Sequence, residues 1–270
     1  MSPSAPESEN AGRFTGLAEI YAAHRPTYPA GIMATLCARA RSVDGTLEGT
    51  GTAIDIGCGT GIATLSLAQG LPDWQIIAAE PNADMLAKAR VTCAGQTNIA
   101  FHAGGADALP CEVASASLVL AAQALHWFAT PAFFAEAARV LVPGGILAIL
   151  YNNRQNAVSA VLSEIETYFE SIDETYSRDY RAQDIPAMLG ALDAFDAVER
   201  EREVWLKPIS CDDLVNYFMS RSMMQPLAKS VGLPKLRQRI GDIASEHARG
   251  GMVDLPFATE LDLARRGPSG

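Results

Sequence analysis

The chain has 270 residues, of which 49% are hydrophobic and 19% are charged, and its formal net charge is −10. This composition is typical of a globular protein with a core large enough to need no disulfides, and the negative charge disfavours nucleic acid as a partner. The five cysteines are odd in number and form no C-x-x-C pair, which argues against a zinc site and favours free thiols in a reducing compartment.

The amino-terminal segment MSPSAPESENAG has neither a basic region nor an apolar run, so we expect no signal peptide and a disordered tail over residues 1–12. Apolar runs of membrane-spanning length do not occur in the sequence. We therefore expect a cytoplasmic protein, a monomer or homodimer, that has no membrane partner. The histidines show no metal-ligand spacing, so we expect no metal.

Short apolar runs alternate with helical patterns between residues 53 and 150. The apolar runs predict strands over 52–58, 74–80, 98–103, 117–123 and 146–152. Helices are predicted over 59–70, 82–91 and 130–141, where Asn82 and Thr130 are suitable first residues. The run VPGG, residues 142–145, predicts a turn before the fifth strand. Such an alternation predicts an α/β fold with a parallel sheet that helices cover on both faces.

The pattern changes after Asn152. A helix is predicted over 156–172, an exposed strand over 197–209, where charged and apolar residues alternate, and a final strand over 252–266. The segments 211–230 and 233–248 have helical spacing. We expect these helices to form a cap over the carboxyl ends of the sheet strands.

A glycine-rich segment, AIDIGCGTG, lies between the first predicted strand and the helix that follows it. Glycines in such a turn let backbone N–H groups approach a ligand closely. Glu80, at the end of the next strand, stands where a ribose-binding acid belongs in a dinucleotide fold. The alternatives are a turn without a ligand and a turn that binds NAD.

Asp55 distinguishes between the possible ligands. It lies two residues before the first glycine, where a buried carboxylate would repel a pyrophosphate. The spacing is also G-x-G-x-G and not the G-x-G-x-x-G of NAD-binding folds. S-adenosylmethionine carries an ammonium and a sulfonium and no phosphate, so the acids Asp55 and Glu80 suit it better than NAD.

Four segments resemble the signature blocks of the class I S-adenosylmethionine-dependent methyltransferases: IDIGCGTG, AAEPNADMLAKAR, AGGADALP and ARVLVPGGILAI. Together they cover about residues 53–151. The stretches FTGLAEIYAAHRPTYP and QALHW resemble a small-molecule subgroup that includes the trans-aconitate methyltransferase-like proteins. The resemblance implies a Rossmann-like methyltransferase fold, which is a doubly wound, mostly parallel seven-stranded sheet with an antiparallel last strand and a helical cap.

This resemblance also implies an organisation and a function. Residues 13–151 would form the S-adenosylmethionine-binding core with an amino-terminal flap, and residues 152–265 the cap elements and the last two strands. The enzyme would transfer a methyl group to a hydroxyl, carboxyl or amine of a small-molecule metabolite and release S-adenosylhomocysteine. The alternatives are a protein of the same fold that binds the cofactor without methylating, such as a cyclase or ligand-binding module, and a nicotinamide oxidoreductase.

The site residues follow from the same resemblance. The expected cofactor-binding residues are Tyr21, Arg25, Asp55, Gly57, Cys58, Gly59, Gly61, Glu80, Pro81, Met85, Ala106, Asp107 and Gln123. Tyr21 and Arg25 belong to the flap, and Asp107 corresponds to the acid that usually holds the adenine amino group. The expected substrate-binding residues are Tyr28, His126, Trp127, Tyr217 and Met223.

His126 is the candidate catalytic residue, because it follows a buried strand that is expected to open onto the methyl group. As a general base it would remove a proton from a hydroxyl or phenol. The alternative is a pocket-wall residue that bonds to the backbone. Tyr217 and Met223 either pack in the core of the cap or line an apolar substrate site.

Overall fold

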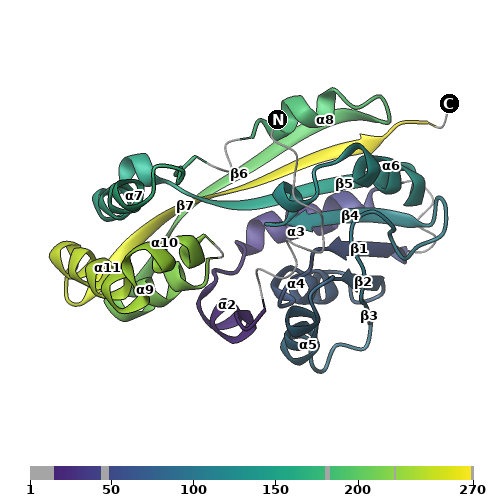
Figure 1. The fold of residues 1–270 in the computed structure, drawn as a ribbon. Helices are drawn as coiled ribbons and strands as arrows, with labels where there is room; N and C mark the ends of the chain where they lie inside the picture. The colour runs from purple at the N-terminus through teal and green to yellow at the C-terminus, as the bar shows by residue number, and fades with distance from the viewer. Residues whose placement is uncertain (1–14, 44–48, 180–182, 222, 269–270) are drawn as a thin grey trace.

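The computed structural model describes residues 15–43, 49–179, 183–221 and 223–268 (Figure 1). The tail expected over residues 1–12 and Phe14 of the flap motif lie outside the described residues. Within the described part of the chain, every helix falls short of the length and apolarity that crossing a membrane requires.

The strands form a seven-stranded sheet in the order β3-β2-β1-β4-β5-β7-β6 (Figure 1). Their bounds are β1 Thr52–Ile56, β2 Gln75–Ala79, β3 Ile99–His102, β4 Ala116–Ala122, β5 Leu141–Arg154, β6 Phe195–Ser210 and β7 Met252–Arg266. Strand β7 pairs antiparallel with both of its neighbours, and the pairs from β3 to β5 are parallel. The predicted mostly parallel sheet with an antiparallel last strand is confirmed.

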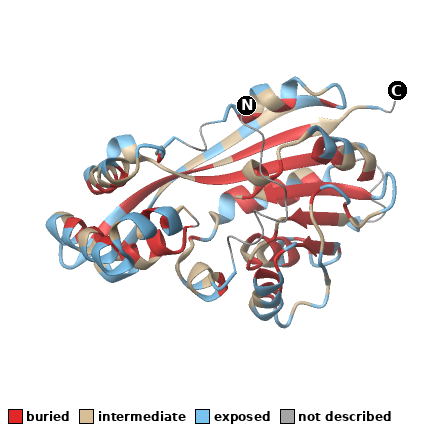
Figure 2. Cartoon of the chain, viewed as in Figure 1, coloured by how far each residue is buried: buried red, intermediate tan, exposed pale blue. Residues whose placement is uncertain are grey.

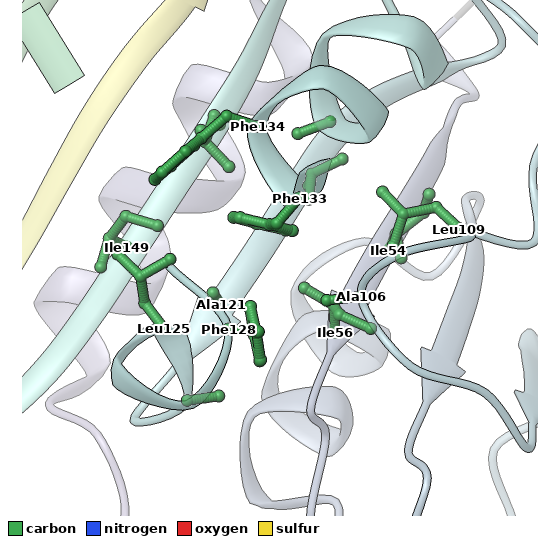
Figure 3. Packing of buried hydrophobic residues seen from close by; sticks show 14 of the residues in the cluster. Ile54, Ile56, Ala106, Leu109, Ala121, Leu125, Phe128, Phe133, Phe134 and Ile149 are labelled. Carbon is green, nitrogen blue, oxygen red and sulfur yellow. The ribbon is translucent and has the colours of Figure 1, made fainter. Parts of the chain in front are cut away.

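Helices cover both faces of the sheet. They are α2 Ala18–His24, α3 Ala30–Arg41, α4 Ile62–Gly70, α5 Ala83–Thr92, α6 Pro131–Val140, α7 Ala160–Ile172, α8 Ile185–Gly190, α9 Cys211–Met219, α10 Met224–Val231 and α11 Leu233–His247, with 3-10 turns η2 Leu125–Trp127 and η3 Asn156–Val158. Ala53 faces α3 and α4, whereas its neighbour Ile54 faces α6 and α8. Figure 3 shows Phe133 of α6 between Ile54 and Ile149. The strands are therefore apolar on both sides because each face of the sheet packs in its own hydrophobic core.

Three strands carry the cap. Strands β5, β6 and β7 have 14, 16 and 15 residues, and their far ends extend beyond the core to helices α7, α9, α10 and α11 (Figure 1). There Leu255 and Phe257 of β7 pack against these helices in a cluster of their own. The expected boundary at residues 151 and 152 falls inside β5, because this strand runs without a break from the core into the cap. Strand β6 is the exposed sheet edge, as its alternating sequence predicts (Figure 2).

Local predictions differ from the structure at two places. The run VPGG lies within β5, where Gly144 has a φ of +77° and the pairing with β4 shifts from Ala116–Leu141 to Leu118–Ile146. The predicted turn is therefore wrong, and the run is an irregularity inside the strand. The helical segment 211–230 is two helices, since the backbone leaves the helix after Met219 and re-enters it at Met224. Helices α3 and α8 were not predicted as elements.

Candidate active site

A pocket lies at the carboxyl ends of β1, β2 and β4, where open α/β sheets bind ligands. Its volume, including the part open to solvent, is about 850 Å³. The predicted site residues that line it are Tyr21, Tyr28, Gly57, Cys58, Gly59, Glu80, Pro81, Met85, Ala106, Gln123 and Trp127. Five chain segments far apart in the sequence therefore meet at one site.

Other lining residues were not predicted. They are Ile56, Thr60, Ile62, Ala63, Gly105, Ala122, Ala124 and Phe128. Most of them are direct neighbours of predicted residues, so their positions in the motifs were a usable signal. Phe128 also packs into the core beside Phe133, with ring centroids 4.9 Å apart.

The glycine loop has the conformation that its sequence indicates. Gly57 has a φ of +67°, and a Cβ at this position would lie 2.8 Å from the Cβ of Ala124. A side chain would therefore push apart the loops after β1 and β4. Gly59 has a φ of +55°, but a Cβ there would meet no atom within 4 Å. The loop thus leaves open space on the pocket side of Gly59.

Glu80 links the ends of β1 and β2. Its side chain is buried, Oε2 accepts a hydrogen bond from Gly59 N at 2.9 Å, and Oε1 accepts one from Asn82 N at 2.9 Å. A carboxylate has about four lone-pair sites, and these two backbone bonds use one on each oxygen. The carboxylate therefore holds the glycine loop and faces the pocket at the same time.

Asp55 lies beneath the pocket and not along its wall. It is fully buried, and its Oδ2 accepts a hydrogen bond from the Thr64 hydroxyl at 2.6 Å. Its Oδ1 is buried without a hydrogen-bond partner among the described residues. The pKa of Asp55 is raised from 3.8 to about 7, chiefly by burial and also by the nearby Glu80 carboxylate, while hydrogen bonds with Thr64 lower it.

The flap approaches the pocket from the amino-terminal side. Tyr21 on α2 and Tyr28 after it line the pocket. The flap backbone is fixed by Asn152 of β5, whose Nδ2 donates to Thr27 O at 3.1 Å. Arg25 does not line the pocket. Its guanidinium lies 4.6 Å from the centre of the Tyr21 ring and faces the cap.

Gln123 closes the pocket at the end of β4. It has a φ of +56°, which is uncommon for a residue other than glycine, asparagine or aspartate. Its Nε2 donates to Asn152 O at 3.3 Å. Uncommon backbone conformations of this kind are concentrated at functional sites. The φ of Gln123 is therefore an independent indication that the turn after β4 belongs to the functional site.

His126 lies behind the pocket wall. Its ring centroid is 4.6 Å from that of Trp127, which lines the pocket, whereas His126 itself does not. The hydroxyl of Tyr151 accepts a hydrogen bond from His126 N at 3.0 Å and lies 3.2 Å from His126 Nδ1. The ring is thus held in one orientation by β5.

The remaining predicted residues do not line the pocket. Gly61 begins α4 with a φ of +85°, and Asp107 is exposed beside Ala106. Tyr217 is buried in the cap, where its hydroxyl accepts from Arg154 Nη1 at 3.2 Å, and Met223 packs against the cap core. A group of three or more metal-ligating side chains does not occur among the described residues.

Comparisons with known proteins agree with this geometry. Residues 53–145 match the family model of the methyltransferase domain. The chain is 26% identical over 265 residues to a candidate methyltransferase of Dictyostelium discoideum, which covers 94% of this chain and 95% of that protein. It is 36% identical over 97 residues to trans-aconitate 2-methyltransferase of Acidovorax sp., which is 36% of each chain. The solved structure of a candidate type II methyltransferase from Anaeromyxobacter dehalogenans has the same fold, with a TM-score of 0.66, 21% identity and coverage of 90% of this chain and 97% of that one.

Proposed function

Since the chain is a class I S-adenosylmethionine-dependent methyltransferase, we propose that it methylates a hydroxyl, carboxyl or amine of a small-molecule metabolite. The observation that carries the proposal is the pocket at the ends of β1, β2 and β4, which the flap and the turn after β4 close from two sides. A small acceptor fits between these walls more readily than a macromolecule.

The pocket residues fit S-adenosylmethionine. The open space above Gly59 and the backbone N–H groups of the loop suit its amino-acid part, and the Glu80 carboxylate suits the two ribose hydroxyls. Pro81, Met85 and Ala106 offer an apolar slot for the adenine, beside which Asp107 is exposed. When bound, the cofactor supplies an activated methyl group on a sulfonium. The protein therefore has to align the acceptor with this methyl group and to exclude water.

Water exclusion falls to the aromatic residues. Tyr21, Tyr28, Trp127 and Phe128 come from the flap and from the turn after β4 and line the same pocket. The bond between Asn152 and Thr27 holds the flap against β5, so the walls keep their spacing. We propose that Tyr28 and Trp127 touch the acceptor and that Tyr21 touches the cofactor.

For His126 the structure supports a role as a pocket-wall residue over a role as a general base. The ring lies behind Trp127 and its Nδ1 is engaged by Tyr151, so a base at this place would need a rearranged ring. A carboxyl acceptor needs no base, since it is already ionised at neutral pH. The relative named for trans-aconitate supports an acceptor of this kind.

The cysteines and the net charge bear on the cellular location and the partners of the enzyme. All five cysteines are free, which supports the expected cytoplasmic location. The net charge of −10 supports a metabolite over nucleic acid as the partner. We further propose that the enzyme has no membrane partner and is a monomer or homodimer.

A screen with isotope-labelled methyl donor tests the proposal. Alcohols, phenols, amines and carboxylic acids are incubated with the enzyme, and labelled product is detected by mass spectrometry. We expect labelled product with at least one class. Tight binding of S-adenosylmethionine by calorimetry, together with no labelled product in any class, would favour a cofactor-binding protein that does not methylate.

A further inference from the structure

A group of charged side chains lies between the flap and the cap, outside the pocket. We call it the arginine cluster, and it consists of Arg25, Arg154, Glu166, Tyr176, Tyr217 and Arg221. Arg154 at the end of β5 donates to Glu166 Oε1 at 2.8 Å, and Arg221 after α9 donates to the same atom at 3.4 Å. The Tyr176 hydroxyl donates to Glu166 Oε2 at 2.6 Å. Elements from four parts of the chain therefore converge on one carboxylate.

The cluster is deeply buried. The side chains of Glu166, Arg221 and Arg154 are 0%, 2% and 12% exposed. Removing charges from water is costly unless each one is paired and hydrogen-bonded. Here Glu166 is the shared ion-pair partner of Arg154 and Arg221, so these two arginines outnumber the carboxylate. The imbalance at this depth therefore needs an explanation.

Arg25 increases the imbalance. Its guanidinium lies 5.8 Å from the centre of the Tyr217 ring, and Arg154 lies 6.0 Å from the same ring. The hydrogen bond of Arg25 within the described residues goes to Ser220 O, a neutral acceptor, at 3.4 Å. The Nε atoms of Arg25 and Arg154 are both buried and have no hydrogen-bond partner among the described residues. Each of these two guanidinium groups therefore has one N–H donor without an acceptor among the described residues.

The positive potential of the cluster is visible at Tyr217. Burial alone would raise the pKa of this buried phenol, yet its pKa is lowered, because Arg154, Arg25 and Arg221 stabilise the phenolate. The same field attracts any anion that comes close. A guanidinium also matches the two oxygens of a carboxylate with two parallel N–H donors.

Tyr21 separates the cluster from the pocket. One face of its ring is covered by the Arg25 guanidinium at 4.6 Å, and Tyr21 also lines the pocket. Helix α2, which carries Tyr21, meets the cap through Ile20, which packs against the cap core, and through His24, whose Nδ1 lies 3.5 Å from Asp213 Oδ1. Arg25, just after the helix, donates to Ser220 O at 3.4 Å. A shift of α2 that moves the Tyr21 ring would open the arginines toward the pocket.

We propose that the arginine cluster binds a carboxylate of the acceptor substrate, so that the substrate is an acid with a carboxylate remote from the atom that is methylated. Arg25 and Arg154 supply the donors, and Tyr217 and Glu166 hold the arginines in place. The proposal rests on the proposed function, because it names the substrate class of the same enzyme. It also assigns Arg25 to the substrate, whereas the sequence alone suggested the cofactor.

The test is calorimetric titration of succinate, glutarate and trans-aconitate into the protein saturated with S-adenosylhomocysteine. The variants are Arg25→Gln, which removes the charge at a half-buried site, and Arg25→Lys, which keeps it. Arg239→Gln is the matched control, because this arginine pairs with Glu164 and Glu246 on the outer side of the cap. Melting temperatures establish that each variant is folded.

We expect at least one of these acids to bind, and Arg25→Gln to weaken its binding roughly 10- to 100-fold. Arg25→Lys should recover part of the loss, Arg239→Gln should bind like the parent, and the Kd for S-adenosylmethionine should be unchanged in all three. The monoamide of the same acid should lose less affinity in Arg25→Gln than the acid does. Arg154→Lys should weaken acid binding as well, provided its melting temperature is retained.

Several results would overturn the proposal. One is no binding of any of the three acids, and another is equal weakening of acid and amide. A loss of S-adenosylmethionine affinity in Arg25→Gln would show that Arg25 binds the cofactor and not the substrate. Labelled methyl transfer to neutral acceptors only, insensitive to Arg25→Gln, would remove the acid subsite but leave the methyltransferase. No methyl transfer to any acceptor would instead refute the proposed function.

Discussion

Replacement of Glu80 by glutamine tests the proposed cofactor position most directly. The carboxylate accepts from Gly59 N and Asn82 N, both at 2.9 Å, and it lines the pocket. In Glu80→Gln one of these N–H groups would face the amide NH₂, donor against donor. The loss of a hydrogen bond to a charged group costs about 1.5–3 kcal/mol, so the Kd for S-adenosylmethionine should rise roughly 10- to 150-fold.

The same change has a cost without ligand. An N–H group of the loop that loses its acceptor lowers the free energy of unfolding by about 1–2 kcal/mol, or roughly 2–8 °C in Tm for a chain of this size. Calorimetry gives the Kd, and thermal unfolding gives Tm. Glu174→Gln is the control, because Glu174 is exposed on the cap side of the chain. Cofactor affinity in Glu80→Gln equal to that of the parent would show that the ribose lies elsewhere.

Three further changes test other parts of the site. The pKa of Asp55 is raised from 3.8 to about 7 in the folded protein. As pH rises, the unfolded chain therefore loses this proton before the folded protein does. The free energy of unfolding should fall as pH rises from about 4 to about 7. Denaturation of the parent and Asp55→Asn across this range should show a larger fall in the parent; equal slopes would mean that Asp55 titrates normally. His126→Gln should keep turnover within roughly tenfold of the parent, whereas a fall of about two to four powers of ten, with loss of a pH-dependent step in the rate, would make His126 a general base. Gly57→Ala should lower the free energy of unfolding by about 1–3 kcal/mol and weaken cofactor binding, because φ is +67° and the new Cβ would meet Ala124 at 2.8 Å. In urea denaturation Gly190→Ala, with open space around it, should be neutral by comparison.

The sequence by itself determined the order of the elements and the core of the site. Apolar runs and helical spacing are local properties, so β1, β2, β4, α4, α5 and α6 lie where the periodicity predicts them. The glycine loop and Glu80 also follow from local pattern, since a tight turn at the end of a strand requires glycine at fixed positions. Parallel strands then bring their carboxyl ends to one sheet edge, which is why the predicted residues after β1, β2 and β4 meet at one pocket.

Tertiary structure alone decided how far the strands extend and which way the long side chains point. The run VPGG predicts a turn, yet pairing with β4 at Leu141 before it and at Ile146 after it keeps β5 one continuous strand. Arg25 belongs to the flap motif, yet its guanidinium turns from the pocket to the cap, since α9 supplies Tyr217 and the acceptor Ser220 O. Arg154 and Glu166 are unremarkable in sequence and become a buried pair only when the chain after β5 folds back as α7 of the cap. Such contacts join residues far apart along the chain, and local periodicity carries no information about them.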